Sequence, residues 1–160
     1  SKKNIPSSRI VLLKSFSKSG FVFFTNKSSK KGKSILNNPN VALNFHWKSI
    51  RKQVRIEGTV LQISKKEVDE YFKTRPFLSK VGAWSSNQSS KLQKREDLKV
   101  RFKKYSAIYK DKIVPRPSYW VGYSVDPSLF EFWEEKKYRL HDRTEYQKIR
   151  NKWIIRKLYP

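Results

Sequence analysis

The residues that could do chemistry begin with a run of serines and lysines between a predicted strand and a predicted helix. Segment 28–34 reads SSKKGKS and ends in Gly-Lys-Ser, as a phosphate-binding P-loop does. A P-loop also needs a glycine five residues before Gly32, and that position is Lys27. We therefore exclude a nucleoside triphosphatase. What remains is either a helix N-terminus that favours a phosphate group or a solvated lysine-rich turn.

The sequence contains only two histidines, His46 and His141, and no cysteine. The lack of thiols excludes disulfides, zinc-thiolate sites, thiol catalysis and iron–sulfur clusters, and two histidines predict no metal site. His141 stands between Arg139 and Arg143, and on a strand these three side chains would share one face. Such a face predicts an anionic or hydrogen-bonding ligand, with an exposed polar strand as the alternative.

The charge of the chain raises a second hypothesis. Its 160 residues hold 37 Lys+Arg against 13 Asp+Glu, a formal net charge of +24, and 37% are hydrophobic, enough for the core of a single domain. High positive charge, with the aromatic segment Phe21–Phe24, is a property of RNA-binding domains. The cations are spread along the whole chain, however, and alternating aromatics are common in cores.

No apolar run approaches the ~20 residues of a membrane span, which predicts no membrane contact.

The elements that must position these residues follow from the apolar pattern and the turn residues. Strands are predicted at 10–13, 21–25, 41–47, 53–63, 119–125, 129–134, 138–142 and 152–158. Helices are predicted for a short segment ending near Pro39 and over about 65–74, 78–84 and 90–109. Ser64 and Glu67 have the spacing of a capping box, and Gly58 predicts a bulge. The order predicts a mainly β (α+β) fold, an antiparallel sheet or barrel with helices at its side.

Several segments together resemble one enzyme family, pyridoxamine 5′-phosphate oxidase. They are Arg9–Lys14 (RIVLLK), Phe24–Asn26 (FTN), Asn37–Pro39 (NNP), Gly82–Ser85 (GAWS), Gln88–Ser90 (QSS), Pro117–Trp120 (PSYW), Glu131–Trp133 (EFW) and Arg139–Arg143 (RLHDR). The resemblance implies a flavin mononucleotide (FMN)-binding split β-barrel with flanking helices, homodimeric, with FMN at the subunit interface. It further implies a single domain over 1–160, with a dimerisation segment at about 117–160. The N-terminal helix and first strand of the family have no counterpart in the sequence, which also lacks methionine.

The resemblance also implies the roles of individual residues. The implied cofactor-binding residues are Arg9, Ile10, Val11, Leu12, Leu13, Lys14, Phe24, Thr25, Lys30, Lys31, Gln53, Gln88, Ser89, Trp133 and Arg143. Among them, Arg9, Lys30 and Lys31 would hold the FMN phosphate. The implied substrate-binding residues are Lys14, Tyr71, Arg75, Ser79, Arg139, Leu140 and His141. Arg139 and His141 would lie over the pyridine ring as the catalytic pair.

The implied reaction is oxidation of pyridoxine 5′-phosphate or pyridoxamine 5′-phosphate by O₂. It yields pyridoxal 5′-phosphate and hydrogen peroxide, with ammonia from the amine, by hydride transfer from substrate C4′ to flavin N5. This is a vitamin B6 salvage activity, expected in the cytoplasm. Two alternatives stay open: a non-catalytic relative that binds flavin or pyridoxal phosphate, and a basic RNA-binding domain.

Overall fold

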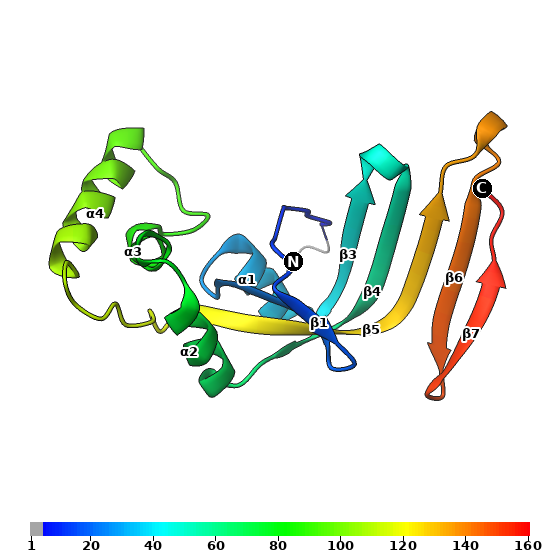
Figure 1. The fold of residues 1–160 in the computed structure, drawn as a ribbon, viewed down its shortest axis with the longest axis horizontal. Helices are drawn as coiled ribbons and strands as arrows, with labels where there is room; N and C mark the ends of the chain where they lie inside the picture. The colour runs from blue at the N-terminus through cyan, green and yellow to red at the C-terminus, as the bar shows by residue number, and fades with distance from the viewer. Residues whose placement is uncertain (1–4) are drawn as a thin grey trace.

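One long strand, β5 (Trp120–Glu134), organises the sheet in the computed structural model, which describes residues 5–160. Strand β2 (Gly20–Asn26) pairs with the first half of β5, and β6 (Asp142–Ile149) pairs with its second half. Strand β4 (Lys52–Gln62) lies along the other side of β5. The outer strands are β1 (Ser15–Ser17) beside β2, β3 (Asn40–Trp47) beside β4, and β7 (Lys152–Lys157) beside β6. All pairs are antiparallel, and Figure 1 shows how sharply β5 bends.

Four helices lie beside the half of the sheet where β2 pairs with β5 (Figure 1). They are α1 (Lys30–Asn37), α2 (Lys65–Thr74), α3 (Phe77–Ser85) and α4 (Arg95–Ile108). Two short 3₁₀ turns, η1 (Lys48–Ile50) and η2 (Lys137–Arg139), follow β3 and β5. No helix among residues 5–160 is long and apolar enough to cross a membrane.

Helix α2 shows how local sequence fixes an element. The Ser64 hydroxyl accepts the Glu67 N–H at 3.2 Å, and the Glu67 carboxylate accepts the Ser64 N–H at 3.1 Å. These reciprocal bonds satisfy two N–H groups that a helix start leaves free. Helix α2 therefore covers Lys65–Thr74, as predicted.

A small buried cluster, separate from the main core, joins α2 to the sheet. Val68 and Phe72 pack on Trp120, and the Phe72 and Trp120 ring centroids lie 5.0 Å apart. Arg116 anchors the same helix, since its Nε donates to the Asp69 carboxylate at 2.5 Å and its Nη1 donates to the Trp120 carbonyl at 2.8 Å. The start of β5 and helix α2 are thus held as one unit.

The aromatic segment Phe21–Phe24 belongs to the fold's interior. Phe23 is 5% exposed and packs in the main core with Ile35, Val60 and the buried residues of β5. Phe24 stacks on both Tyr71 and Trp120, at 4.2 and 4.8 Å between ring centroids, and those two rings also contact each other at 6.2 Å. The core interpretation of this strand is confirmed by Phe23, while Phe24 is half-buried.

Five predicted elements differ from the structure. Segment 10–13 is not a strand, because among the described residues no strand pairs with it. Predicted strands 119–125 and 129–134 are one strand, β5, because Pro127 lies at a β-bulge where its missing N–H costs no ladder bond. Segment 138–142 is not a strand either, and β6 begins at Asp142. Helix α4 begins at Arg95 rather than near Ser90, because Lys94 and Asp97 form its cap.

The bulge requires a glycine on β4. The register between β4 and β5 shifts between Glu57 and Gly58, as the sequence predicted. A Cβ on Gly58 would lie 2.1 Å from the Asp126 carbonyl oxygen, so this backbone contact cannot accommodate a side chain. The close approach lets β4 follow β5 through its bend.

We predict that Gly58→Ala destabilises the fold by about 1–3 kcal/mol, the usual cost of forcing an extra methyl into a packed site. Urea unfolding would measure the change. Gly82→Ala in α3 is the matched control, because a Cβ there meets no heavy atom within 4 Å. Alanine should be neutral or stabilising at that helical position. Equal stability of the Gly58→Ala and wild-type chains would contradict the packing argument.

Candidate functional site

Four predicted site residues gather where β2 meets the start of α1, and we call Arg9, Thr25, Lys31 and Gln88 the Lys31 cluster. The Lys31 ammonium is buried and donates to the Thr25 hydroxyl, which in turn donates to the Gln88 side-chain oxygen at 3.1 Å. The same oxygen accepts the N–H of Asn26 at 3.2 Å. Gln88, distant in sequence, is thereby fixed beside β2.

The electrostatics of this cluster favour an anion. Burial removes water from the Lys31 ammonium, and the positive charge of Arg9 acts in the same direction, so the Lys31 pKa falls to about 8. Its hydrogen-bond partner is a neutral hydroxyl. A buried ammonium held this way gains from a phosphate or sulfate group, which would restore its charge balance.

The helix start beside this cluster is capped from within. The Ser29 hydroxyl accepts the N–H of Gly32 at 3.1 Å, and Ser29 is buried. Lys30, the neighbouring predicted cation, is exposed, and so is Arg9. Of the predicted residues 10–14, Val11 packs against the main core, whereas Ile10, Leu12, Leu13 and Lys14 are exposed. This segment lines an open cavity of about 1220 Å³ together with Lys31 and β3.

A second predicted group forms at the junction of α2 and α3. Tyr71 stacks on Phe24, and the Arg75 guanidinium lies 4.8 Å from the Trp120 ring centroid. Burial lowers the pKa of Arg75, and its Nη1 is buried without a hydrogen-bond partner. Ser79 is half-buried in the first turn of α3. A half-buried guanidinium with an unsatisfied Nη1, beside an aromatic surface, suits an anionic group on a flat molecule.

The third group lies across the second half of β5, and we call Gln53, Trp133 and Arg143 the Trp133 row. Gln53 of β4 pairs with Trp133 of β5, which pairs with Arg143 of β6, so the three side chains share one face. His141 joins them, with its ring centroid 4.8 Å from that of Trp133. Backbone register alone thus aligns three predicted residues from three strands.

The turn before β6 corrects one sequence prediction. Arg139, His141 and Arg143 do not share a strand face, because Tyr138 and Arg139 have φ of 59° and 63°, in the left-handed region. The turn is closed by the Leu140 N–H, which donates to the Lys137 carbonyl at 3.1 Å. Arg139, Tyr138 and His141 instead line a small cavity of about 500 Å³ that also includes Arg51 and Glu135. Leu140 is exposed.

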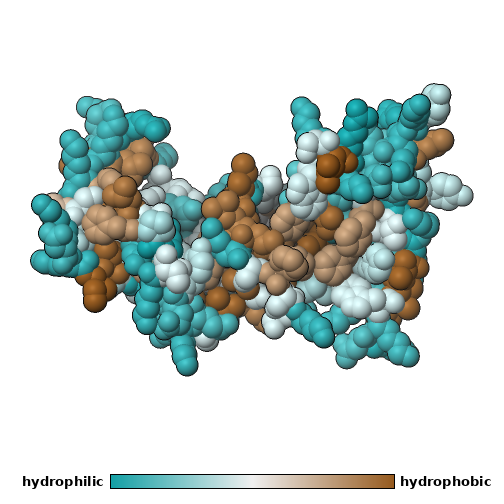
Figure 2. All heavy atoms as spheres, viewed as in Figure 1, coloured by the Kyte–Doolittle hydropathy of each residue, from teal (hydrophilic) through white to brown (hydrophobic). Residues whose placement is uncertain are grey.

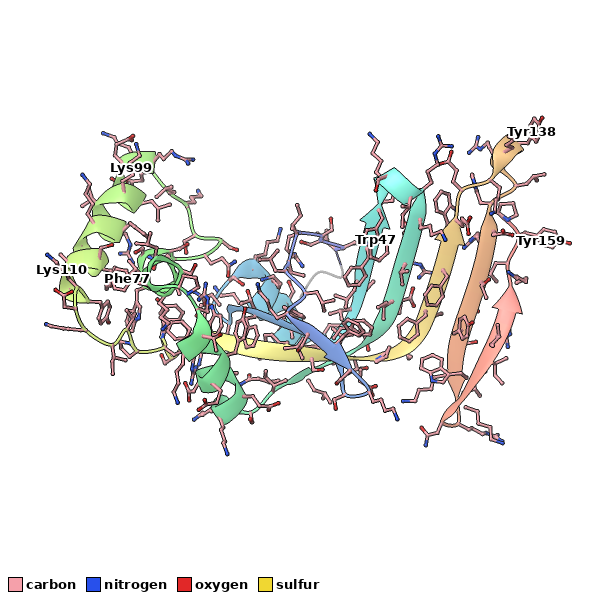
Figure 3. The ribbon with its side chains drawn as sticks, viewed as in Figure 1. Trp47, Phe77, Lys99, Lys110, Tyr138 and Tyr159 are labelled. Carbon is pink, nitrogen blue, oxygen red and sulfur yellow. The ribbon has the colours of Figure 1, made fainter. Side chains whose placement is uncertain are left out.

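The structure therefore divides the predicted residues into two regions. Thr25 pairs with Val121 and Gln53 with Trp133, 12 positions further along β5, or about 40 Å of strand at about 3.3 Å per residue. Figure 3 shows Phe77, between Arg75 and Ser79 in sequence, and Tyr138, next to Arg139, at opposite ends of the molecule. Within one chain, Arg9 and Lys31 line one cavity, whereas Arg139 and His141 line another.

Comparisons with known proteins cover nearly the whole chain. A family model described as pyridoxamine 5′-phosphate oxidase matches residues 1–109, and one described as the pyridoxine 5′-phosphate oxidase C-terminal dimerisation region matches residues 120–160. The chain belongs to the pyridoxamine 5′-phosphate oxidase family.

Named relatives and solved structures agree with this. A pyridoxine/pyridoxamine 5′-phosphate oxidase of Ehrlichia chaffeensis is 49% identical over 97% of this chain and 79% of its own length. One of Granulibacter bethesdensis is 46% identical over 100% of this chain and 78% of its own. The structure of PhzG from Burkholderia lata superposes with a TM-score of 0.90 at 28% identity, over 96% of this chain and 75% of that one. The resemblance inferred from the sequence motifs is confirmed.

Two features of this family member were missed by sequence reasoning. Arg101 of α4 donates to the Ser85 carbonyl at 2.7 Å and to the Asn87 side chain at 3.3 Å, holding the loop that carries Gln88. In that loop Ser89 has φ of 70° and is exposed. The second feature is Glu131, a carboxylate that is 4% exposed in the second half of β5. Its position within an aromatic strand, between Phe130 and Phe132, was a signal that could have been used.

We predict that anion binding at the Lys31 cluster weakens as pH rises through about 8, because Lys31 then loses its proton. Sulfate keeps its charge over this range, so the rise in melting temperature that it causes should be smaller at pH 9.5 than at pH 7. Lys31→Arg is the control, since a guanidinium stays charged. If the sulfate-induced rise in melting temperature declined equally in the Lys31→Arg variant, the pH effect would come from a group other than Lys31.

Proposed function

We propose that this chain is an FMN-dependent oxidase that converts pyridoxine 5′-phosphate or pyridoxamine 5′-phosphate to pyridoxal 5′-phosphate. The observation that carries the proposal is a 49% identity, over nearly the whole chain, to a relative of that name. The charged and aromatic groups described above support it, because they suit two phosphate groups and two flat rings. A cytoplasmic location, expected from the sequence, stays a prediction.

The Lys31 cluster fits the phosphate end of FMN. A buried ammonium bonded to a hydroxyl, with Arg9 close enough to lower its pKa, has positive charge without a carboxylate partner in its hydrogen bond. Thr25 and Gln88 add a hydroxyl and an amide to the same place. We assign these residues, with Lys30 and Ser89, to the phosphate and its neighbouring atoms.

The Trp133 row fits the ring end of FMN. An indole, an amide and a guanidinium on one face offer a flat apolar surface with hydrogen-bond donors at its edge. When bound, FMN supplies two-electron redox chemistry, with O₂ as the final acceptor and hydrogen peroxide as product, which side chains cannot supply. The protein residues then have to bind, orient and hydrogen-bond.

Substrate binding is assigned to the residues flanking these groups. Arg75 has a buried Nη1 without a partner, which a substrate phosphate would satisfy, with Tyr71, Ser79 and Lys14 as further contacts. Arg139 would hold the pyridine ring from the other side. Fixing both ends of the substrate presents its C4′ carbon in one orientation, and positioning of this kind can lower a barrier substantially.

The structure indicates how His141 would act. Its Nδ1 accepts the backbone N–H of Lys136 at 3.2 Å, so in the neutral ring the proton is on Nε2. We therefore propose that His141 donates a hydrogen bond from Nε2 to the substrate. The Trp133 ring contacts the His141 ring at an interplanar angle of 49° and limits its movement.

A homodimer with FMN at the subunit interface would unite the two regions. Within one chain the Lys31 cluster and the residues beside Trp133 line separate cavities, whereas one mononucleotide would have to contact both groups. The segment matched by the dimerisation model, residues 120–160, also exposes Trp153, Ile154 and Ile155 on the edge strand β7. Figure 2 shows apolar surface across the middle of the molecule and in separate patches at this edge. Such patches are typical of interfaces.

We predict that the purified protein binds FMN and consumes O₂ when pyridoxine 5′-phosphate is added. Arg139→Ala should lower turnover far more than FMN affinity, because Arg139 is assigned to substrate. Lys31→Ala should lower FMN affinity far more than turnover, because Lys31 is assigned to the FMN phosphate. Flavin absorbance and pyridoxal 5′-phosphate formation measure the two effects. Bound flavin without turnover would instead support a non-catalytic relative, and an RNA gel shift without flavin binding would support the RNA-binding alternative.

We predict complementation between Lys31→Ala and Arg143→Ala chains refolded together. If each site takes the Lys31 cluster from one chain and the Trp133 row from the other, a mixed dimer has one intact site and one doubly altered site. At an FMN concentration too low to load either parent, random assortment then restores about a quarter of wild-type activity. Mixtures as inactive as the parents would show that a single chain forms the whole site.

A further inference from the structure

Glu131 is a buried carboxylate one row away from the proposed flavin ring site. It lies on the same face of β5 as Trp133, two residues before it, and pairs with Arg55 of β4. Its exposure is 4%, which is unusual for a glutamate and requires paired charges. No role in the reaction proposed above uses this residue.

Both oxygens of Glu131 are held by guanidinium groups. Arg55 donates from Nη2 to Oε2 at 2.6 Å, and Arg143 donates from Nε to Oε1 at 2.7 Å. Arg55 also pairs with Glu57 on its own strand. The hydrogen bond from Arg143, ahead of that from Arg55, lowers the pKa of Glu131 although burial opposes it. The carboxylate is therefore ionised at neutral pH.

Arg143 is fixed at two points. Besides the bond from Nε to Glu131, its Nη1 donates to the Tyr159 carbonyl at 2.8 Å. A guanidinium has five N–H groups in one plane, so these two bonds set its orientation and leave three donors. An arginine without such partners loses side-chain entropy when it binds a ligand.

We infer that Glu131 is a positioning residue for the flavin: with Arg55 behind it, it holds the Arg143 guanidinium in the orientation that meets FMN. The inference rests on the proposed function, in which Arg143 contacts FMN. Arg55 supplies a second positive charge, so the carboxylate keeps a counter-charge while Arg143 turns its free donors to the ligand. The three residues come from adjacent strands, and the sheet register places them together.

A merely structural role explains the arrangement less well. Strands β4, β5 and β6 are already joined by continuous backbone ladders on both sides of Glu131. Buried ion pairs between such strands add little net stability compared with apolar side chains of the same size. The measurable effect of this carboxylate is therefore expected on Arg143, and through it on FMN.

The test is an FMN titration of the flavin-free protein, followed by flavin fluorescence. Glu131→Gln keeps the size of the side chain and removes its charge, and we expect FMN affinity to fall about tenfold, as a loss of about 1.4 kcal/mol gives. In the Arg143→Ala background the same change should have no further effect, because Glu131 acts through Arg143. Glu134→Gln is the control, a carboxylate on the same strand whose side chain is 41% exposed.

The outcomes separate the two proposals. If the wild-type chain does not bind FMN, the proposed function is wrong. If it binds FMN and Glu131→Gln binds equally well, or if the effects of Glu131→Gln and Arg143→Ala multiply in the double variant, the positioning role is overturned. If Glu131→Gln does not fold, the cause would be Arg55, which loses its carboxylate partner in that variant. The double variant Arg55→Met/Glu131→Gln removes this unpaired guanidinium. That chain should still bind FMN more weakly than an Arg55→Met chain.

Discussion

The pairing of β5 with β2, β4 and β6 is the constraint on which the rest of the structure depends. β5 pairs with β2 at one end, with β6 at the other, and with β4 over most of its length. Because Pro127 and Gly58 meet at the bulge, the strand bends there without losing its ladder. The first half of β5 supports the buried core and the Lys31 cluster, and the second half carries the Trp133 row. The separation of the two regions is a direct consequence of that continuity.

Charge is treated in opposite ways in the two regions. In the first, the cations Lys31 and Arg75 are partly or wholly buried without carboxylates in their hydrogen bonds, and both pKa values are lowered. A bound anion stabilises the charged form of such groups. In the second, Glu131 stands between Arg55 and Arg143, whose guanidinium pKa values it raises. In the first region the positive charges of Lys31 and Arg75 remain available to a phosphate group. In the second region the ion pairs fix the orientation of the Arg143 side chain.

Two of the loops that carry predicted site residues contain left-handed backbone, which also occurs at Arg51, Asp111, Arg150 and Asn151. Ser89, beside Gln88, has φ of 70°, and the adjacent Tyr138 and Arg139 have φ of 59° and 63°. Non-glycine residues adopt such values at a cost, so surrounding contacts must hold them. Arg101 supplies such contacts for the first loop, and the Leu140 N–H closes the second. The side chains of Arg139 and Gln88 thus owe their positions to neighbours rather than to regular elements.

The sequence by itself determined the local elements and the family. The Ser64 and Glu67 cap, the bulge at Gly58 and the aromatic core strand were predicted because the spacing of a few residues decides each of them. Only the tertiary structure decided the rest. The continuity of β5 through Pro127, the turn at Arg139 and the burial of Glu131 depend on which strands lie alongside. Strand pairing and burial join residues far apart in sequence, so their energies are absent from any local pattern.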